Sequence, residues 1–131
     1  MPYPAPFTQL SILARREPMS DYIEFLKETF ATFGPVNSRR MFGGHGLYFD
    51  GLMFGLVTQD MLYLKADAEN RHFFEAEGLE KFSYEKQGKR YSIAYFQAPD
   101  QLFDDPEEAA IWARRSWQAA LRGAAKKQRA R

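Results

Sequence analysis

Hydrophobic residues recur at helical spacing near the beginning of the chain. The predicted helix begins at Met19, with Ser20 as a suitable N-cap, and ends where Gly34 is followed by proline. Its apolar stripe consists of Ile23, Leu26, Phe30 and Phe33.

A second and more strongly marked helix is predicted close to the other end. Asp105 is placed to cap it, Pro106 suits its first turn, and Glu108 stands three residues after the cap. One face of this helix carries Ala109, Trp112, Ala113, Ser116, Trp117, Ala120 and Leu121.

Between these helices the hydrophobic period changes from helical to alternating. Residues 39–50 and 52–58 predict two strands joined by a tight turn at Asp50-Gly51. Gln59-Asp60 then turns the chain into a third strand over residues 61–65.

Two further strands follow a short helix, which Asp67 is placed to cap and Gly78 to end. These strands cover residues 82–86 and 90–97, with Gln87-Gly88-Lys89 between them. The element order is α-β-β-β-α-β-β-α, which predicts an α+β fold: a two-layer sandwich of an antiparallel sheet with helices on one face.

The bulk composition fits one globular domain. A chain of 131 residues has the length of a single domain and contains no cysteine, so a disulfide framework and a thiolate metal site are excluded. No stretch is apolar enough for a membrane span, and the N-terminus lacks the pattern of a secretory signal, so we expect a cytoplasmic protein with no membrane contact. We divide the chain into a flexible arm (residues 1–18), a folded body (19–121) and a disordered basic tail (122–131).

Charge is unevenly distributed. The net charge is +1, but the last ten residues contain five cations and no acid, which leaves −4 on residues 1–121. A basic tail can contact phosphates, or it can be a solvated chain end. Its candidate contact residues are Arg122, Lys126, Lys127, Arg129 and Arg131.

A glycine-rich segment lies within the first predicted strand. Glycines in a strand favour a bend, a bulge or the close approach of another backbone. The alternative is an anion or ligand site, because glycine amides and nearby arginines can bind a negative group. The candidate residues of that site are Arg39, Arg40, Gly43, Gly44, His45 and Gly46. The spacing matches neither dinucleotide nor nucleoside-triphosphate glycine motifs.

Residue types that carry chemistry do not form a recognisable constellation. His45 and His72 are the two histidines, and no metal-ligand spacing accompanies them. None of the serines lies in a nucleophile-elbow pattern. We therefore expect a protein that is not an enzyme and needs neither a cofactor nor a metal.

Aromatic residues are abundant and have two interpretations. Tyrosines on strands can form a base-stacking platform when basic residues alternate with them. Few basic residues alternate with the tyrosines here, so we favour ordinary cross-strand packing. Trp112 and Trp117 are core residues or, if exposed, a candidate partner surface on the last helix.

Several segments together resemble the N-terminal domain of the TfoX/Sxy competence regulators. They are SRRMFGGHGLYFDGLMFGLV (38–57), LYLKAD (62–67), AENR (68–71), Phe82-Ser83-Tyr84 and DDPEEAAIWARRSW (104–117). The resemblance covers residues 19–121. It implies a two-layer fold of the secretion-chaperone-like kind, no defined catalytic residues, and a role in the expression of DNA-uptake genes. Full-length members also carry a C-terminal helical domain, which we expect this chain to lack.

Three functional hypotheses follow. The first is a regulatory module that acts through protein partners near transcription, as a monomer or a homodimer. The second is direct, mainly electrostatic binding of nucleic acid by the basic tail, with Arg39 and Arg40 assisting. The third is a small-ligand protein or enzyme that uses the Gly43 to Gly46 region.

Overall fold

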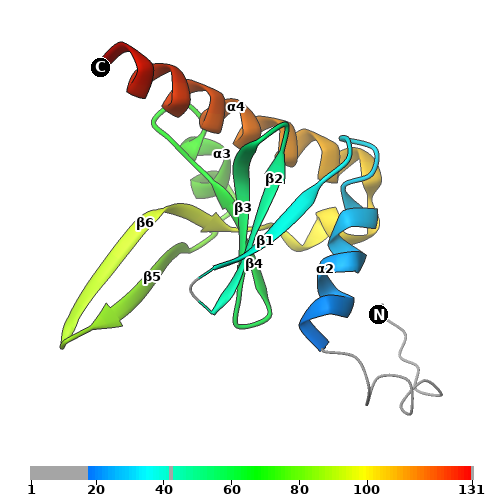
Figure 1. Ribbon diagram of the computed structural model, residues 1–131, viewed down its shortest axis with the longest axis horizontal. Helices are drawn as coiled ribbons and strands as arrows, with labels where there is room; N and C mark the ends of the chain where they lie inside the picture. Colours follow the sequence, from blue (N-terminus) through cyan, green and yellow to red (C-terminus); the bar gives the residue numbers. More distant parts are fainter. Residues whose placement is uncertain (1–17, 42, 131) are drawn as a thin grey trace.

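The computed structural model describes residues 18–41 and 43–130, which form one antiparallel sheet and a set of helices (Figure 1). The strands are β1 (Asn37–Met41), β2 (Gly44–Phe49), β3 (Leu52–Thr58), β4 (Met61–Lys65), β5 (Lys81–Lys86) and β6 (Lys89–Gln97). The helices are α2 (Pro18–Thr29), α3 (Arg71–Ala76), the 3-10 turn η1 (Asp100–Asp104) and α4 (Pro106–Ala130). The sheet order is β1-β2-β3-β4-β6-β5.

Tight turns join neighbouring strands because residues with positive φ are available at each reversal. Gly51 and Gly88 have φ of +79°, and the residues before them also adopt positive φ, which matches the right-handed twist of a hairpin. The turn residues are Asp50-Gly51, Gln59-Asp60 and Gln87-Gly88, as the sequence predicted.

The helices of the described residues pack on one face of the sheet, which confirms the predicted α+β two-layer fold. The core contains residues of α2, α3 and α4 together with strand residues from β2, β3, β4 and β6. Phe30, Phe54 and Phe74 are fully buried at its centre. Phe30 meets Phe54 edge-to-face at 5.6 Å, whereas Phe74 stacks on Phe96 at 5.1 Å.

A bulge in β3 adds a residue to the core face. Leu47 pairs with Gly55, and Tyr48 pairs with Met53, so Phe54 is the extra residue of β3. The bulge turns both Phe54 and Gly55 toward the helices. A Cβ at residue 55 would lie 3.4 Å from the Leu47 side chain, which is ordinary van der Waals contact.

Three predicted boundaries differ from the structure. The single strand over residues 39–50 is two strands, because the chain reverses at Gly43, where φ is +76°. The first helix begins at Pro18, so Ser20 is inside it and is not its N-cap. The expected arm otherwise lies outside the described residues. Helix α4 continues to Ala130, so the predicted disorder after Leu121 is wrong for the described part of the tail.

Candidate functional site

The glycine-rich segment forms the β1–β2 hairpin, in which Gly43 has a positive φ, Gly44 is required by packing and Gly46 is closely packed. A Cβ on Gly44 would lie 2.1 Å from the backbone oxygen of Val57 on β3. A Cβ on Gly46 would lie 3.0 Å from both the Tyr48 ring and the Met53 sulfur. The favoured interpretation, a bend with close backbone approach, therefore describes this segment.

The two arginines of the hairpin lie on opposite faces of the sheet. Arg39 pairs with Gly46, whereas Arg40 pairs with His45. His45 in turn pairs with Val57, which is a core residue, so this pair is on the helix side. The Arg39 guanidinium lies 5.0 Å from the centre of the Tyr48 ring. The six residues of the candidate anion site thus do not converge on one point.

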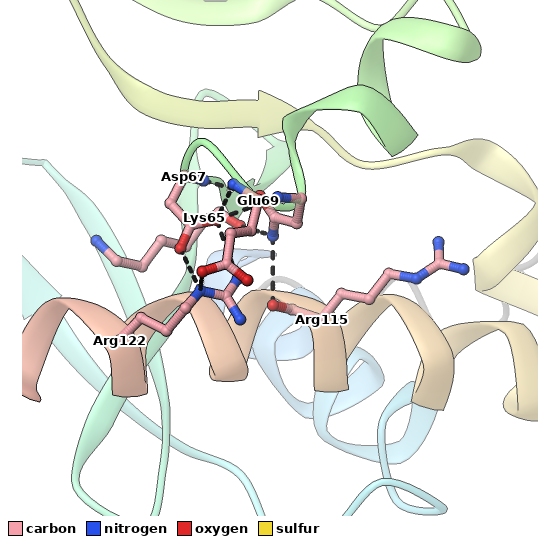
Figure 2. Close-up of polar contacts among 6 residues, drawn as sticks. Lys65, Asp67, Glu69, Arg115 and Arg122 are labelled. Atoms are coloured by element: carbon pink, nitrogen blue, oxygen red, sulfur yellow. Dashed lines mark hydrogen bonds and ion pairs between the residues drawn. The ribbon is translucent and has the colours of Figure 1, made fainter.

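Arg122, the first residue of the expected basic tail, is engaged in a structural ion pair (Figure 2). Its Nε donates to Oδ2 of Asp67 at 2.7 Å and its Nη2 donates to Oδ1 at 3.0 Å. Glu69 adds a further carboxylate at 3.5 Å. Arg122 is therefore not available for phosphates. Lys126, Lys127 and Arg129 are exposed on the last turns of α4, and Arg131 lies outside the described residues.

The ion pair continues into a buried amide that joins α3, β4 and α4. Asn70 is 3% exposed, and its Oδ1 accepts the backbone N–H of Asp67 at 2.8 Å. Its Nδ2 donates to the carbonyls of Lys65 and Arg115, at 3.2 and 3.3 Å. Sequence patterns did not identify this residue, although aspartate and asparagine are both common turn residues.

Protonation in this region reflects both pairing and burial. The hydrogen bond from Arg122 is the main cause that lowers the pKa of Asp67, and the same bond raises the pKa of Arg122. Burial, followed by the charge of Lys127, lowers the pKa of Lys65, and Asp67 partly opposes this. Lys65 and Lys127 are therefore two neighbouring cations, and the nearby carboxylate is already bound by Arg122.

The two tryptophans do not form an exposed partner surface. Trp112 is 3% exposed, and its Nε1 donates to Glu108 at 3.2 Å. Trp117 is half-buried, donates to the carbonyl of Phe49 at 3.0 Å and packs edge-to-face on that ring. Both tryptophans therefore pack in or against the core. The hypothesis that they form a partner surface required exposed side chains, which they do not have.

A groove of about 410 Å³ runs between α3 and α4. Ile111, 39% exposed, lies in it beside Arg115, whose guanidinium is 3.6 Å from the centre of the Phe73 ring. Two carboxylates, Glu77 and Glu108, and the imidazole of His72 complete the polar part of the lining. This arrangement offers an apolar contact flanked by both signs of charge.

The face of the sheet opposite the helices carries aromatic and basic side chains. Arg39, Tyr48, Tyr63, Lys65 and Tyr95 all lie on it, because each shares a face with its cross-strand partner. Burial, with a smaller contribution from Tyr48, raises the pKa of Tyr95 to about 12. The sequence showed these residues but not their common face.

Within residues 18–41 and 43–130, no group of three or more histidine, aspartate or glutamate side chains is placed to hold a metal ion. No helix in that part of the chain is both long and apolar enough to cross a membrane.

Comparison with known proteins agrees with the resemblance noted in the sequence. Residues 28–120 match the family model described as the TfoX N-terminal domain. The chain is 37% identical over 83 residues to DNA transformation protein TfoX1 of Aliivibrio fischeri, an alignment that covers 60% of this chain and 39% of that protein. It is 25% identical over 96 residues to protein Sxy of Escherichia coli, which covers 73% of this chain and 46% of Sxy. The chain thus spans less than half the length of either relative, and it belongs to the TfoX N-terminal domain family.

Proposed function

We propose that this chain is a non-enzymatic regulatory binding module that promotes the expression of DNA-uptake genes through a protein partner. The observation that carries the proposal is membership of the TfoX N-terminal domain family, together with similarity to a protein named for DNA transformation. The match includes most of the folded body, from the end of α2 to the middle of α4.

The α3–α4 groove supports a binding role and gives the partner a place to dock. Ile111 is one of two large apolar residues of α4 that are exposed, and it is the one that lines the groove. Arg115 is held against Phe73 and Trp112, at 3.6 and 5.1 Å from the two ring centres, so its charge is presented in a defined orientation. A partner segment with one apolar side chain and a neighbouring carboxylate fits this surface.

The proposal is tested in the host strain after deletion of this gene. Transcripts of DNA-uptake genes and the transformation frequency are measured with the gene absent, with the wild-type chain restored, and with Ile111→Asp. We expect the deletion to lower both quantities, the wild-type chain to restore them, and Ile111→Asp to fail. Leu121→Asp is the matched control, because Leu121 is 41% exposed on the same helix but outside the groove.

Unchanged transcripts in the deletion strain would overturn the regulatory role. Full rescue by Ile111→Asp would leave the regulatory role standing but remove the groove as the docking surface. Circular dichroism and thermal unfolding of both variants show whether each chain is folded, so that loss of function is assigned to the surface and not to unfolding.

A further inference from the structure

The β5–β6 hairpin extends away from the body of the domain (Figure 1). Residues 84–94 are all exposed, and Tyr84 and Tyr91 are each 42% exposed. These two tyrosines are cross-strand partners whose rings stack with centroids 5.5 Å apart and an interplanar angle of 27°. Exposed, paired tyrosines on a projecting hairpin are a surface that core packing does not explain.

The tyrosine pair continues along the sheet as a row of rings. The ring centroids of Tyr84 and Phe82 are 6.0 Å apart, and those of Phe82 and Tyr63 on β4 are 4.9 Å apart. Tyr95 on β6 pairs with Lys65 of β4 and lies on the same face, where it is largely buried. The aromatic row therefore runs from the hairpin onto the face of the sheet that the helices leave uncovered.

Cations accompany this row. Lys86 and Lys89 pair across the tip of the hairpin on the same face as Tyr84 and Tyr91. Lys65 places its Nζ 5.2 Å from the centre of the Tyr95 ring, and Arg39 stands over Tyr48.

Acidic side chains are almost excluded from the sheet. The six strands contain seven basic residues and one acid, Glu85, which pairs with Arg90 on the other face of the hairpin. The slightly acidic character of residues 1–121 therefore comes from helices and turns. The net charge of the chain therefore does not describe the strands, whose charged side chains are nearly all basic.

We propose that this face binds single-stranded nucleic acid, with bases stacked on Tyr84 and Tyr91 and phosphates held by Lys86, Lys89 and Lys65. Aromatic rings beside cations on an open sheet suit unpaired bases, whose faces are accessible, whereas the bases of a duplex are stacked on each other.

A second copy of the chain is a poorer occupant of this face. Two copies would bring two rows of cations together with no facing carboxylates. Lysines at both ends of the edge strand β5, Lys81 and Lys86, also oppose edge-to-edge pairing.

The test is a fluorescence-anisotropy titration of the full chain with labelled oligothymidylate of about 15 nucleotides, the upper range of sites on one small domain. The titration is repeated with oligouridylate, which separates RNA from DNA as the source of the strand, and with duplex DNA of the same length. We expect the single strands to bind more tightly than the duplex and binding to weaken as salt increases.

Two sets of variants separate stacking from charge. Tyr84→Ser with Tyr91→Ser should weaken binding roughly fivefold or more, whereas the Phe replacements at both positions should bind as the wild type does, because the rings remain. Lys86→Gln with Lys89→Gln should reduce the slope of log affinity against log salt by about 1.4, at about 0.7 for each phosphate contact. Lys27→Gln with Arg114→Gln is the charge-matched control on the helix side.

Several outcomes would overturn the proposal: no binding at low salt, equal affinity for duplex and single strand, or an equal loss in the control pair. A dimer in sedimentation experiments that the Tyr84 and Tyr91 replacements dissociate would assign the face to a second copy instead. The Lys86 and Lys89 variant lies at an exposed turn and keeps the test valid if the serine variant fails to fold. The Ile111→Asp variant should bind the oligonucleotides normally, so failure of the groove proposal and failure of this one are distinguishable.

Discussion

Replacement of Asn70 tests whether one buried amide holds three elements of this fold together. The side chain links the end of β4, the turn before α3 and the middle of α4 through three hydrogen bonds to backbone groups. One of these bonds joins residues 45 positions apart in the chain. Asn70→Ala removes all three bonds and leaves their backbone partners in a buried region.

The expected loss can be worked from these contacts. A typical hydrogen bond contributes about 0.5–1.5 kcal/mol net, and a buried group left without a partner costs about 1–3 kcal/mol. With partial access of water to the exposed turn, three bonds predict a decrease of roughly 2–4 kcal/mol in the free energy of unfolding. That is a large share of the roughly 5–15 kcal/mol that stabilises a typical domain.

The measurement is urea unfolding followed by tryptophan fluorescence, because Trp112 and Trp117 lie in or against the core. Gln101→Ala is the control: this exposed side chain makes one hydrogen bond, to Glu77 at 3.1 Å, and its loss should change stability by less than about 0.5 kcal/mol. Asn70→Asp keeps the acceptor for the Asp67 N–H but turns an oxygen toward two carbonyls, so it should be at least as unstable as Asn70→Ala at neutral pH.

The reasoning is refuted if Asn70→Ala lies within about 0.5 kcal/mol of the wild type at an unchanged m value. That result would mean that water replaces the amide at little cost, and that the ion pair between Arg122 and Asp67 is sufficient to join α4 to the turn before α3.

Three further predictions concern packing and protonation. Gly44→Ala should lower the free energy of unfolding in urea by about 1–3 kcal/mol, because its Cβ would overlap the carbonyl oxygen of a β3 residue. Gly123→Ala is the comparison: the space around residue 123 is open, and the change to a better helix former should raise the free energy of unfolding by roughly 0.5–1 kcal/mol. Arg122→Gln should lower the free energy of unfolding by roughly 1 kcal/mol at neutral pH. Because the folded pKa of Asp67 is lowered, that difference should shrink as pH falls below about 4, and a constant difference in pH-dependent unfolding would contradict the ion-pair argument. The Tyr95→Phe variant should lose one phenolate step near pH 12 in an ultraviolet titration; because the folded pKa is raised, the wild type should lose stability relative to this variant as pH rises above about 10.

Local signals in the sequence were sufficient for most elements of the fold. The turn at Asp50-Gly51 and the strands on both sides of it follow from alternation and from positive φ at the turn residues. Asp105 caps α4 as predicted, since its Oδ1 accepts the N–H groups of Glu107 and Glu108 at 3.1 and 3.2 Å. Such features depend on residues within one turn of each other, so they can be predicted from the sequence alone.

The candidate sites were predicted less well, because each depends on distant partners. Arg122 was grouped with a basic tail, and only the fold brings Asp67, 55 residues earlier, to its guanidinium. Consecutive glycines are compatible both with a hairpin turn and with a bend within one strand, and only the structure shows that the chain reverses at Gly43. The family resemblance was confirmed because it rests on ordered residue identities, which do not require contacts to be known.

The sequence by itself determined the elements, their order and the layered α+β class, because hydrophobic period, turn residues and helix caps are local properties. The tertiary structure alone decided which side of the sheet the helices cover, and hence which aromatic residues stay accessible. The alternating direction of side chains along a strand assigns each residue to one of two faces, but it does not show which face the helices cover. The scarcity of acids in the strands is a property of their sequences. Only the fold brings basic and aromatic side chains of separate strands onto one face.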